Sequence, residues 1–249
     1  MAVFTIAGRE LRAIFHTTIG WLVLAGFLFL NGIFFMVFLD FYAQASADFM
    51  GSAYGAATMT LTDHLLAPYY RNIATILLMV CPALSMRLYA EERRHKTLEL
   101  LLTSPVSTTE IVLGKFLGAW GFVAVLLAGL LYIPALLGAW STPDVGALLT
   151  AHLGLMLVAG AALAIGGLFS SLVDNQITAL VLTIAANLAL YVIGAVGGPD
   201  TLAGQVSLLN HLETLLTGGL RLSDLVYFAG LSGVFLFATH QRVESFRWS

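Results

Sequence analysis

Two short patterns contain residue types that could carry out chemistry, and neither is complete. Residues 230–233 (Gly-Leu-Ser-Gly) match the GxSG pattern of rhomboid-like intramembrane proteases, in which a histidine from another helix takes the serine proton. His240 lies on the same apolar stretch, about 12 Å further along a helix, and His152 is predicted near the end of a different helix. Residues 114–116 (Gly-Lys-Phe) lack the upstream glycine and the following Ser or Thr of a phosphate-binding loop. We therefore predict no catalytic residue and no ATP hydrolysis through such a loop.

Asp63 and His64 form the clearest pair of potential metal ligands. Two adjacent residues cannot both face one ion from a helix, and no further cluster of ligand residues joins them. We expect no metal site and no cofactor bound by this chain. Residues 40–72, which contain the pair, are predicted to be a solvated external loop.

The composition excludes several classes of protein. Hydrophobic residues make up 59 % of the 249 residues and charged residues only 10 %, against about 25 % in an average soluble domain. So few charges could not keep a soluble globule of this size dispersed. A soluble enzyme, a nucleic-acid-binding protein and a disordered chain are therefore excluded, and a polytopic membrane protein remains.

Six apolar segments are long enough, or nearly so, to cross a bilayer, which needs about 20 apolar residues per helix. Their apolar residues are continuous rather than alternating, which argues against a transmembrane β-barrel. We predict an all-α membrane protein with a single domain over residues 1–249. Its membrane helices are predicted at residues 19–39, 73–89, 116–138, 148–172, 177–196 and 224–240.

The basic residues are distributed unequally between the two predicted sides of the membrane. With the N-terminus inside, nine of the 11 lie inside and only Arg71 and Arg221 lie outside, as the positive-inside rule requires. The nine are Arg9, Arg12, Arg87, Arg93, Arg94, Lys96, Lys115, Arg242 and Arg247. We therefore expect a multi-pass protein of the cell's inner (plasma) membrane with both termini in the cytoplasm.

Three segments outside the predicted membrane helices have patterns of their own. Residues 1–18 have apolar side chains on one helical side and predict an amphipathic helix in the membrane interface. Residues 197–223 predict either short external helices that dip into the outer leaflet or a plain loop. Residues 91–110 contain a leucine-rich helix that Pro105 ends, followed by a capping box that begins at Ser107. This last segment predicts a short amphipathic helix that presents a docking surface in the cytoplasm.

The polar residues inside the predicted membrane helices are neutral, which argues against an ion-coupled carrier with a charge at the membrane centre. In one interpretation Asn31, Thr75, Thr183 and Asn187 form hydrogen bonds between helices. In the other, Asn31, Thr183 and Asn187 line a substrate path.

Small residues also recur and predict close helix packing, within the chain or at a dimer seam. They include Gly114, Gly118, Ala159, Gly160, Gly166 and Gly167.

Three stretches around the predicted docking surface resemble a known family. They are residues 89–92 (Tyr-Ala-Glu-Glu), 96–106 (Lys-Thr-Leu-Glu-Leu-Leu-Leu-Thr-Ser-Pro-Val) and 110–116 (Glu-Ile-Val-Leu-Gly-Lys-Phe). Together they resemble the signature of ABC type-2 exporter permeases, in which this region carries the coupling helix. The stretches 210–213 (Asn-His-Leu-Glu), 224–228 (Asp-Leu-Val-Tyr-Phe) and 244–248 (Glu-Ser-Phe-Arg-Trp), with Gly218, are similar to the gliding-motility-associated subgroup of these permeases.

The resemblance implies six membrane helices, an N-terminal interface helix, a coupling helix between the second and third membrane helices, and short external helices before the sixth. It implies a second permease chain, identical or related, and cytoplasmic ATPase subunits that bind ATP and Mg. Membrane lipid is an expected partner and nucleic acid is not. The positions that the resemblance assigns to contact with the ATPase are Glu91, Glu92, Thr97, Glu99, Leu101, Leu102, Ser104 and Pro105.

On this interpretation the chain is a non-catalytic permease subunit that couples ATP hydrolysis by a partner to export. The alternative is a stand-alone polytopic channel or a rhomboid-like intramembrane enzyme. A partner ATPase distinguishes the two interpretations, because only the first requires one.

Overall fold

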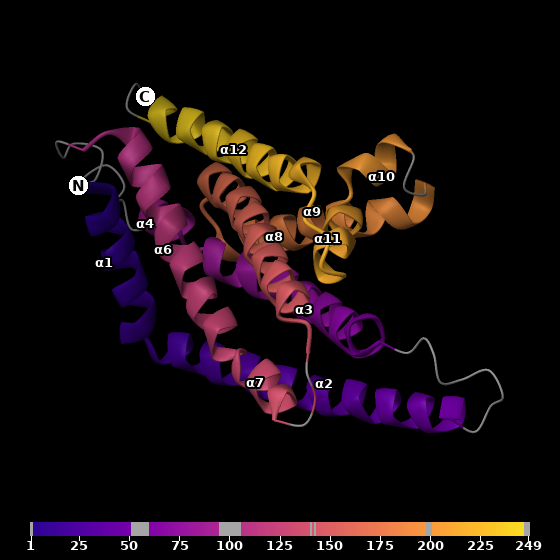
Figure 1. Ribbon diagram of the computed structural model, residues 1–249. Coiled ribbons are helices and arrows are strands. Elements are labelled where there is room, and N and C mark those ends of the chain that lie inside the picture. The colour runs from indigo at the N-terminus through magenta and orange to yellow at the C-terminus, as the bar shows by residue number, and fades with distance from the viewer. Residues whose placement is uncertain are drawn as a thin grey trace.

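The computed structural model describes residues 2–50, 60–94, 106–139, 141, 143–197 and 201–246. These residues form helices and turns, with no strand among them. Six helical segments are long and apolar enough to cross a membrane, so the predicted all-α architecture is confirmed (Figure 1). The elements in chain order are α1 (Ala2–His16), α2 (Thr18–Met50), the π-helical turn η1 (Thr62–Leu66), α3 (Ala67–Ser85), α4 (Ala90–Arg94), α6 (Thr108–Gly129), α7 (Tyr132–Gly138), α8 (Val145–Leu172), α9 (Gln176–Gly197), α10 (Leu202–Val206), α11 (Leu208–Leu216) and α12 (Leu222–Ser245).

The solvated loop predicted over residues 40–72 is wrong for most of its length. Helix α2 continues to Met50, because residues 40–50 contain neither glycine nor proline. Helix α3 begins early because Pro68 lies in its first turn, where its missing N–H costs no hydrogen bond. Asp63 belongs to η1 and pairs with Thr60, and no metal-binding group of three or more residues occurs in the described ranges.

The second and third membrane segments are interrupted where continuous helices were expected. Helix α3 ends at Ser85 and residues 86–89 form a turn before α4. The third segment is divided between α6 and α7, with Leu130 and Leu131 in the turn. Pro134 has no N–H to donate to the carbonyl of Leu130, which explains a break at this point.

Helix α8 is the centre of the bundle and packs against α3, α6, α9, α11 and α12. A Cβ at Gly154 would lie 3.0 Å from α11, and one at Gly160 would lie 3.4 Å from α6. A Cβ at Gly166 would lie only 1.9 Å from the Oγ of Ser85 in α3. The predicted close packing of small residues is therefore found within the chain at Gly166, and Gly154 shows it as well, whereas a Cβ at Gly160 would be in ordinary van der Waals contact with α6.

Helix α1 lies along the first half of α6 (Figure 1). A Cβ at Gly114 would meet Ile6 at 2.7 Å, and one at Gly118 would meet Glu10 at 2.6 Å, so both glycines are needed for this approach. Ile6 is buried while Arg9 is exposed, as an amphipathic helix requires. The position of this helix in a membrane interface stays a prediction.

We predict that Gly166→Val strongly destabilises the protein, because the new side chain overlaps Ser85 in a closely packed helix contact. Overpacking of this kind costs about 1–3 kcal/mol of unfolding free energy. Thermal unfolding of the detergent-solubilised protein measures the effect. Gly230→Ala in α12 is the control, since a Cβ there meets nothing within 4 Å. Equal melting temperatures for the two variants would contradict the packing argument.

Candidate functional site

The predicted coupling segment is flanked by two described helices. Residues 95–105, which include Thr97, Glu99, Leu101, Leu102, Ser104 and Pro105, lie outside the described residues. Helix α4 precedes them and α6 follows them, and the last turn of α12 lies beside both (Figure 1). We call this region the α4 end of the bundle, and the region of α10 and α11 the α11 end.

Helix α6 begins where the sequence predicts. The Oγ of Ser107 accepts a hydrogen bond from the N–H of Glu110, and the Glu110 side chain accepts one from the N–H of Ser107. This reciprocal pair satisfies backbone donors that have no partner within the helix. The predicted capping box is confirmed, and it sets Thr108 as the first residue of α6.

Helix α4 is held by a side chain from α8. The Oγ of Ser170 accepts hydrogen bonds from the N–H groups of Tyr89 and Ala90, both at 3.1 Å, and donates one to the carbonyl of Met86 at 2.9 Å. Ser170 therefore satisfies both a carbonyl of the turn and the donors at the start of α4. The turn between α3 and α4 is thereby attached to the centre of the bundle.

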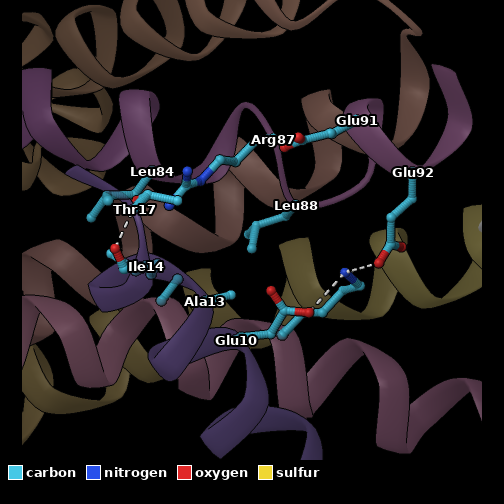
Figure 2. Close-up of a pocket in the computed structure, with 11 residues that line it drawn as sticks. Glu10, Ala13, Ile14, Thr17, Leu84, Arg87, Leu88, Glu91 and Glu92 are labelled. Carbon is cyan, nitrogen blue, oxygen red and sulfur yellow. Dashed lines mark hydrogen bonds and ion pairs between the residues drawn. The ribbon is translucent and has the colours of Figure 1, made fainter. Parts of the chain in front are cut away.

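A buried ammonium group joins three helices at the α4 end. The Nζ of Lys115 in α6 lies 2.7 Å from a carboxylate oxygen of Glu92 in α4 and 3.3 Å from one of Glu10 in α1 (Figure 2). The Lys115 side chain is 2 % exposed, and its ammonium also lies 5.5 Å from the ring centroid of Tyr89. A charge so far from water needs paired carboxylates, which explains why α1, α4 and α6 meet here.

The same charges border a cavity of about 400 Å³ between α1, α4 and α6 (Figure 2). The charged residues that line it are Glu10, Arg87, Glu91, Glu92 and Lys115. Glu91 is exposed, whereas Glu92 faces Lys115. The two adjacent glutamates, assigned one role by the resemblance, therefore lie in different surroundings.

The pairing of Lys115 was not predicted. Its sequence signal is a lysine at the start of an apolar run, which is typical of a side chain that reaches back to water. Glu10 is 105 residues away in the chain, and no spacing rule connects residues so distant. Only the packing of α1 on α6 brings these charges together.

Asn31, Thr183 and Asn187 are all fully buried, and their role in a substrate path stays a prediction. Asn31 and Thr183 donate to carbonyls in their own helices, at Phe27 and Ala179. Thr75 was also predicted to form a hydrogen bond between helices. Its hydroxyl in α3 lies 3.2 Å from the hydroxyl of Tyr191 in α9, so here the predicted bond is found.

Asn187 differs from the other buried polar residues. Neither polar atom of its side-chain amide has a hydrogen-bond partner among the described residues. A buried amide without a partner is costly. In the predicted substrate path, Asn187 therefore has both polar atoms of its side chain without a partner among the described residues, whereas Asn31 lacks one only at its Oδ1.

The protease pattern has no supporting geometry. The Nδ1 of His152 lies 3.0 Å from the hydroxyl of Tyr70 in α3 and 3.0 Å from the carbonyl of Leu148. His240 is on the same helix as Ser232. In the ranges that the structure describes, no hydrogen bond joins Ser232 to a histidine, so nothing there activates the serine.

A second cluster lies at the α11 end. The Nδ1 of His211 in α11 is 2.7 Å from a carboxylate oxygen of Asp224 in α12, and its ring stacks on Tyr227 at 4.0 Å between centroids. Arg71 of α3 pairs with Glu213 of α11 at 2.6 Å. The motif residues near the C-terminus thus form contacts between elements.

We predict that Lys115→Met lowers the free energy of unfolding by about 3 kcal/mol, the usual effect of breaking a buried ion pair, because Glu10 and Glu92 lose their cation. Thermal unfolding followed by tryptophan fluorescence measures the loss. Arg9→Met is a matched control, since Arg9 also pairs with Glu10 but is 56 % exposed. A Lys115 variant as stable as the Arg9 variant would contradict the assigned role.

The comparison with protein families agrees with this architecture. A model described as ABC-2 family transporter protein matches residues 55–212, and a comparison with curated proteins finds no significant match. The matched range covers more than half of the chain and extends from the residues before α3 into α11. The chain therefore belongs to the ABC-2 family of transporter proteins, as a membrane-spanning permease.

Proposed function

We propose that this permease exports its substrate across the inner membrane with energy from ATP hydrolysed by a separate cytoplasmic ABC ATPase. Family membership and six apolar helices support the transport role. The sequence has no phosphate-binding loop, so ATP and Mg are bound by the partner and this chain needs no cofactor. The subgroup of gliding-motility-associated permeases is the closer assignment that we propose within the family.

The ATPase docks at the α4 end, on the coupling segment. In this proposal Glu91, Thr97, Glu99, Leu101, Leu102, Ser104 and Pro105 contact the ATPase directly. Glu92 acts inside the permease instead, because its carboxylate is paired with Lys115. The observation that carries the proposal is the pairing of Lys115 with Glu92 and Glu10. These two ion pairs link α6 to α4 and to α1, beside the segment that the ATPase would move.

The α4 end faces the cytoplasm. Most basic residues belong to the predicted inside segments, and α1 begins and α12 ends near α4 (Figure 1). Both termini are therefore cytoplasmic, and α10 and α11 lie on the external side. The short helices between α9 and α12 agree with the predicted external helices.

Two permease chains form the transport unit, and the substrate passes between them. Asn187, whose buried amide has unused hydrogen bonds, is the strongest candidate for a contact that forms in another conformation. Asn31 and Thr183 belong to the same proposed path. ATP binding drives the change only if the ATPase binds the inward-open and outward-open states with different affinity.

We predict that Glu91→Lys combined with Glu99→Lys reduces recovery of the ATPase by roughly tenfold, because charge reversal at a docking surface replaces attraction by repulsion. Affinity purification of the permease from its native membrane, with the recovered P-loop ATPase quantified by mass spectrometry, measures this. Asp48→Lys, an exposed change at the far end of α2, is the control. Absence of any P-loop ATPase from the unmodified preparation would refute the proposed function.

A further inference from the structure

We propose that the last turn of α12 positions the coupling segment by holding both of its ends, and that α12 transmits its motion to α10 and α11. Phe246 and Glu244 are the positioning residues. The coupling role of residues 95–105 rests on the proposed function, whereas the mechanical link along α12 does not.

The first contact holds the helix that follows the segment. The hydroxyl of Thr108 donates a hydrogen bond to the carboxylate of Glu244. Thr108 is the first residue of α6 and is 2 % exposed. A charge-assisted hydrogen bond shielded from water is stronger than an exposed one, so it fixes this end of α6 to α12.

The second contact holds the helix that precedes the segment. The guanidinium of Arg93 in α4 lies 4.7 Å from the ring centroid of Phe246, and that of Arg242 lies 4.7 Å from the same centroid. Arg93 also pairs with Asp174 at 2.7 Å and donates to the carbonyl of Ser171 at 3.0 Å. Phe246 therefore contacts a cation whose position is already set by the end of α8.

Through these contacts, the helices on both sides of the coupling segment are attached to the same turn of α12. Arg93 and Thr108 are separated by residues 94–107 in the chain, yet their partners Phe246 and Glu244 are two residues apart. Any displacement of the segment that moves either flanking helix must therefore move this turn or break a contact to it.

The opposite end of α12 holds the external helices. His211 of α11 contacts Asp224 through Nδ1 and the carbonyl of Gln205 through Nε2, at 2.7 and 3.0 Å. Both ring nitrogens of His211 therefore lie within hydrogen-bond distance of an oxygen from another element. Tyr227 stacks on His211 and donates its hydroxyl hydrogen to the carbonyl of Val206, at the end of α10.

Helix α12 is a continuous mechanical connection between the two ends. Its 24 residues form one helix of about 36 Å without proline. The helices that the chain itself joins to the coupling segment are interrupted, by residues 86–89 between α3 and α4 and by Leu130 and Leu131 after α6. Figure 1 shows α12 extending without a break from the C-terminal end of the chain to α11. A continuous helix transmits a displacement that a turn would absorb.

Hydrogen–deuterium exchange of the isolated permease in lipid nanodiscs tests the link without any ATPase. We expect Phe246→Ala to accelerate exchange in residues 201–216 by about threefold, the order of effect expected from loss of one cation–π contact. Phe246→Tyr keeps the ring and should restore the original rate. Phe237→Ala is the control, an exposed phenylalanine of the same helix. Unchanged exchange with Phe246→Ala, or an equal change with Phe237→Ala, would overturn the proposal.

The complete complex gives a second readout. In the unmodified complex we expect ATP to change exchange in residues 201–216, and Glu244→Gln combined with Phe246→Ala to abolish this response while the ATPase stays bound. An intact ATP response in the double variant overturns the inference. If no ATPase is recovered with the unmodified chain, the proposed function fails, and the nanodisc result still decides whether α12 connects the two ends.

Discussion

The packing of five helices against α8 is the constraint on which the rest of the structure depends. Lipid tails are as apolar as leucine, so helices in a bilayer gain little from apolar burial and associate through close packing and polar contacts. A Cβ at Gly154 or Gly166 would crowd α11 or α3, and Gly160, midway between them, faces α6 at ordinary contact distance. The remaining neighbours, α9 and α12, complete the ring around this helix.

Polar contacts complement this packing at the two ends of the bundle. Lys115 and Ser170 hold the α4 end, where three helices and a turn converge. Asp224 and Glu213 hold α11 at the other end. Groups of this kind are expensive to bury alone, and each is stable because its partner comes from another helix. The bundle is therefore closely packed in its centre and specifically connected at its ends.

This arrangement suits a protein that converts a push at one end into movement at the other. A closely packed centre resists deformation, because its side chains have few alternative arrangements. In the proposed exporter the ATPase would act on the α4 end, and α12 would carry the movement to α11. The unpaired amide of Asn187, between these ends, is the buried group that most needs a partner.

The sequence by itself determined the all-α class, the six membrane segments, the capping box at Ser107 and the family. These depend on composition, on runs of neighbouring residues and on spacings of a few positions, which act locally along the chain. Its prediction of a loop was wrong for residues 40–50, because a short stretch without glycine or proline continues a helix once the helix has begun.

Only the tertiary structure decided which charges meet. Glu10 and Lys115, Arg93 and Phe246, and Thr108 and Glu244 are pairs separated by more than 100 residues. Glu91 and Glu92 are alike in sequence, yet one is exposed and the other is paired with a buried lysine. Side-chain pairing depends on the rotation and depth of each packed helix, and no local pattern in the sequence specifies these quantities.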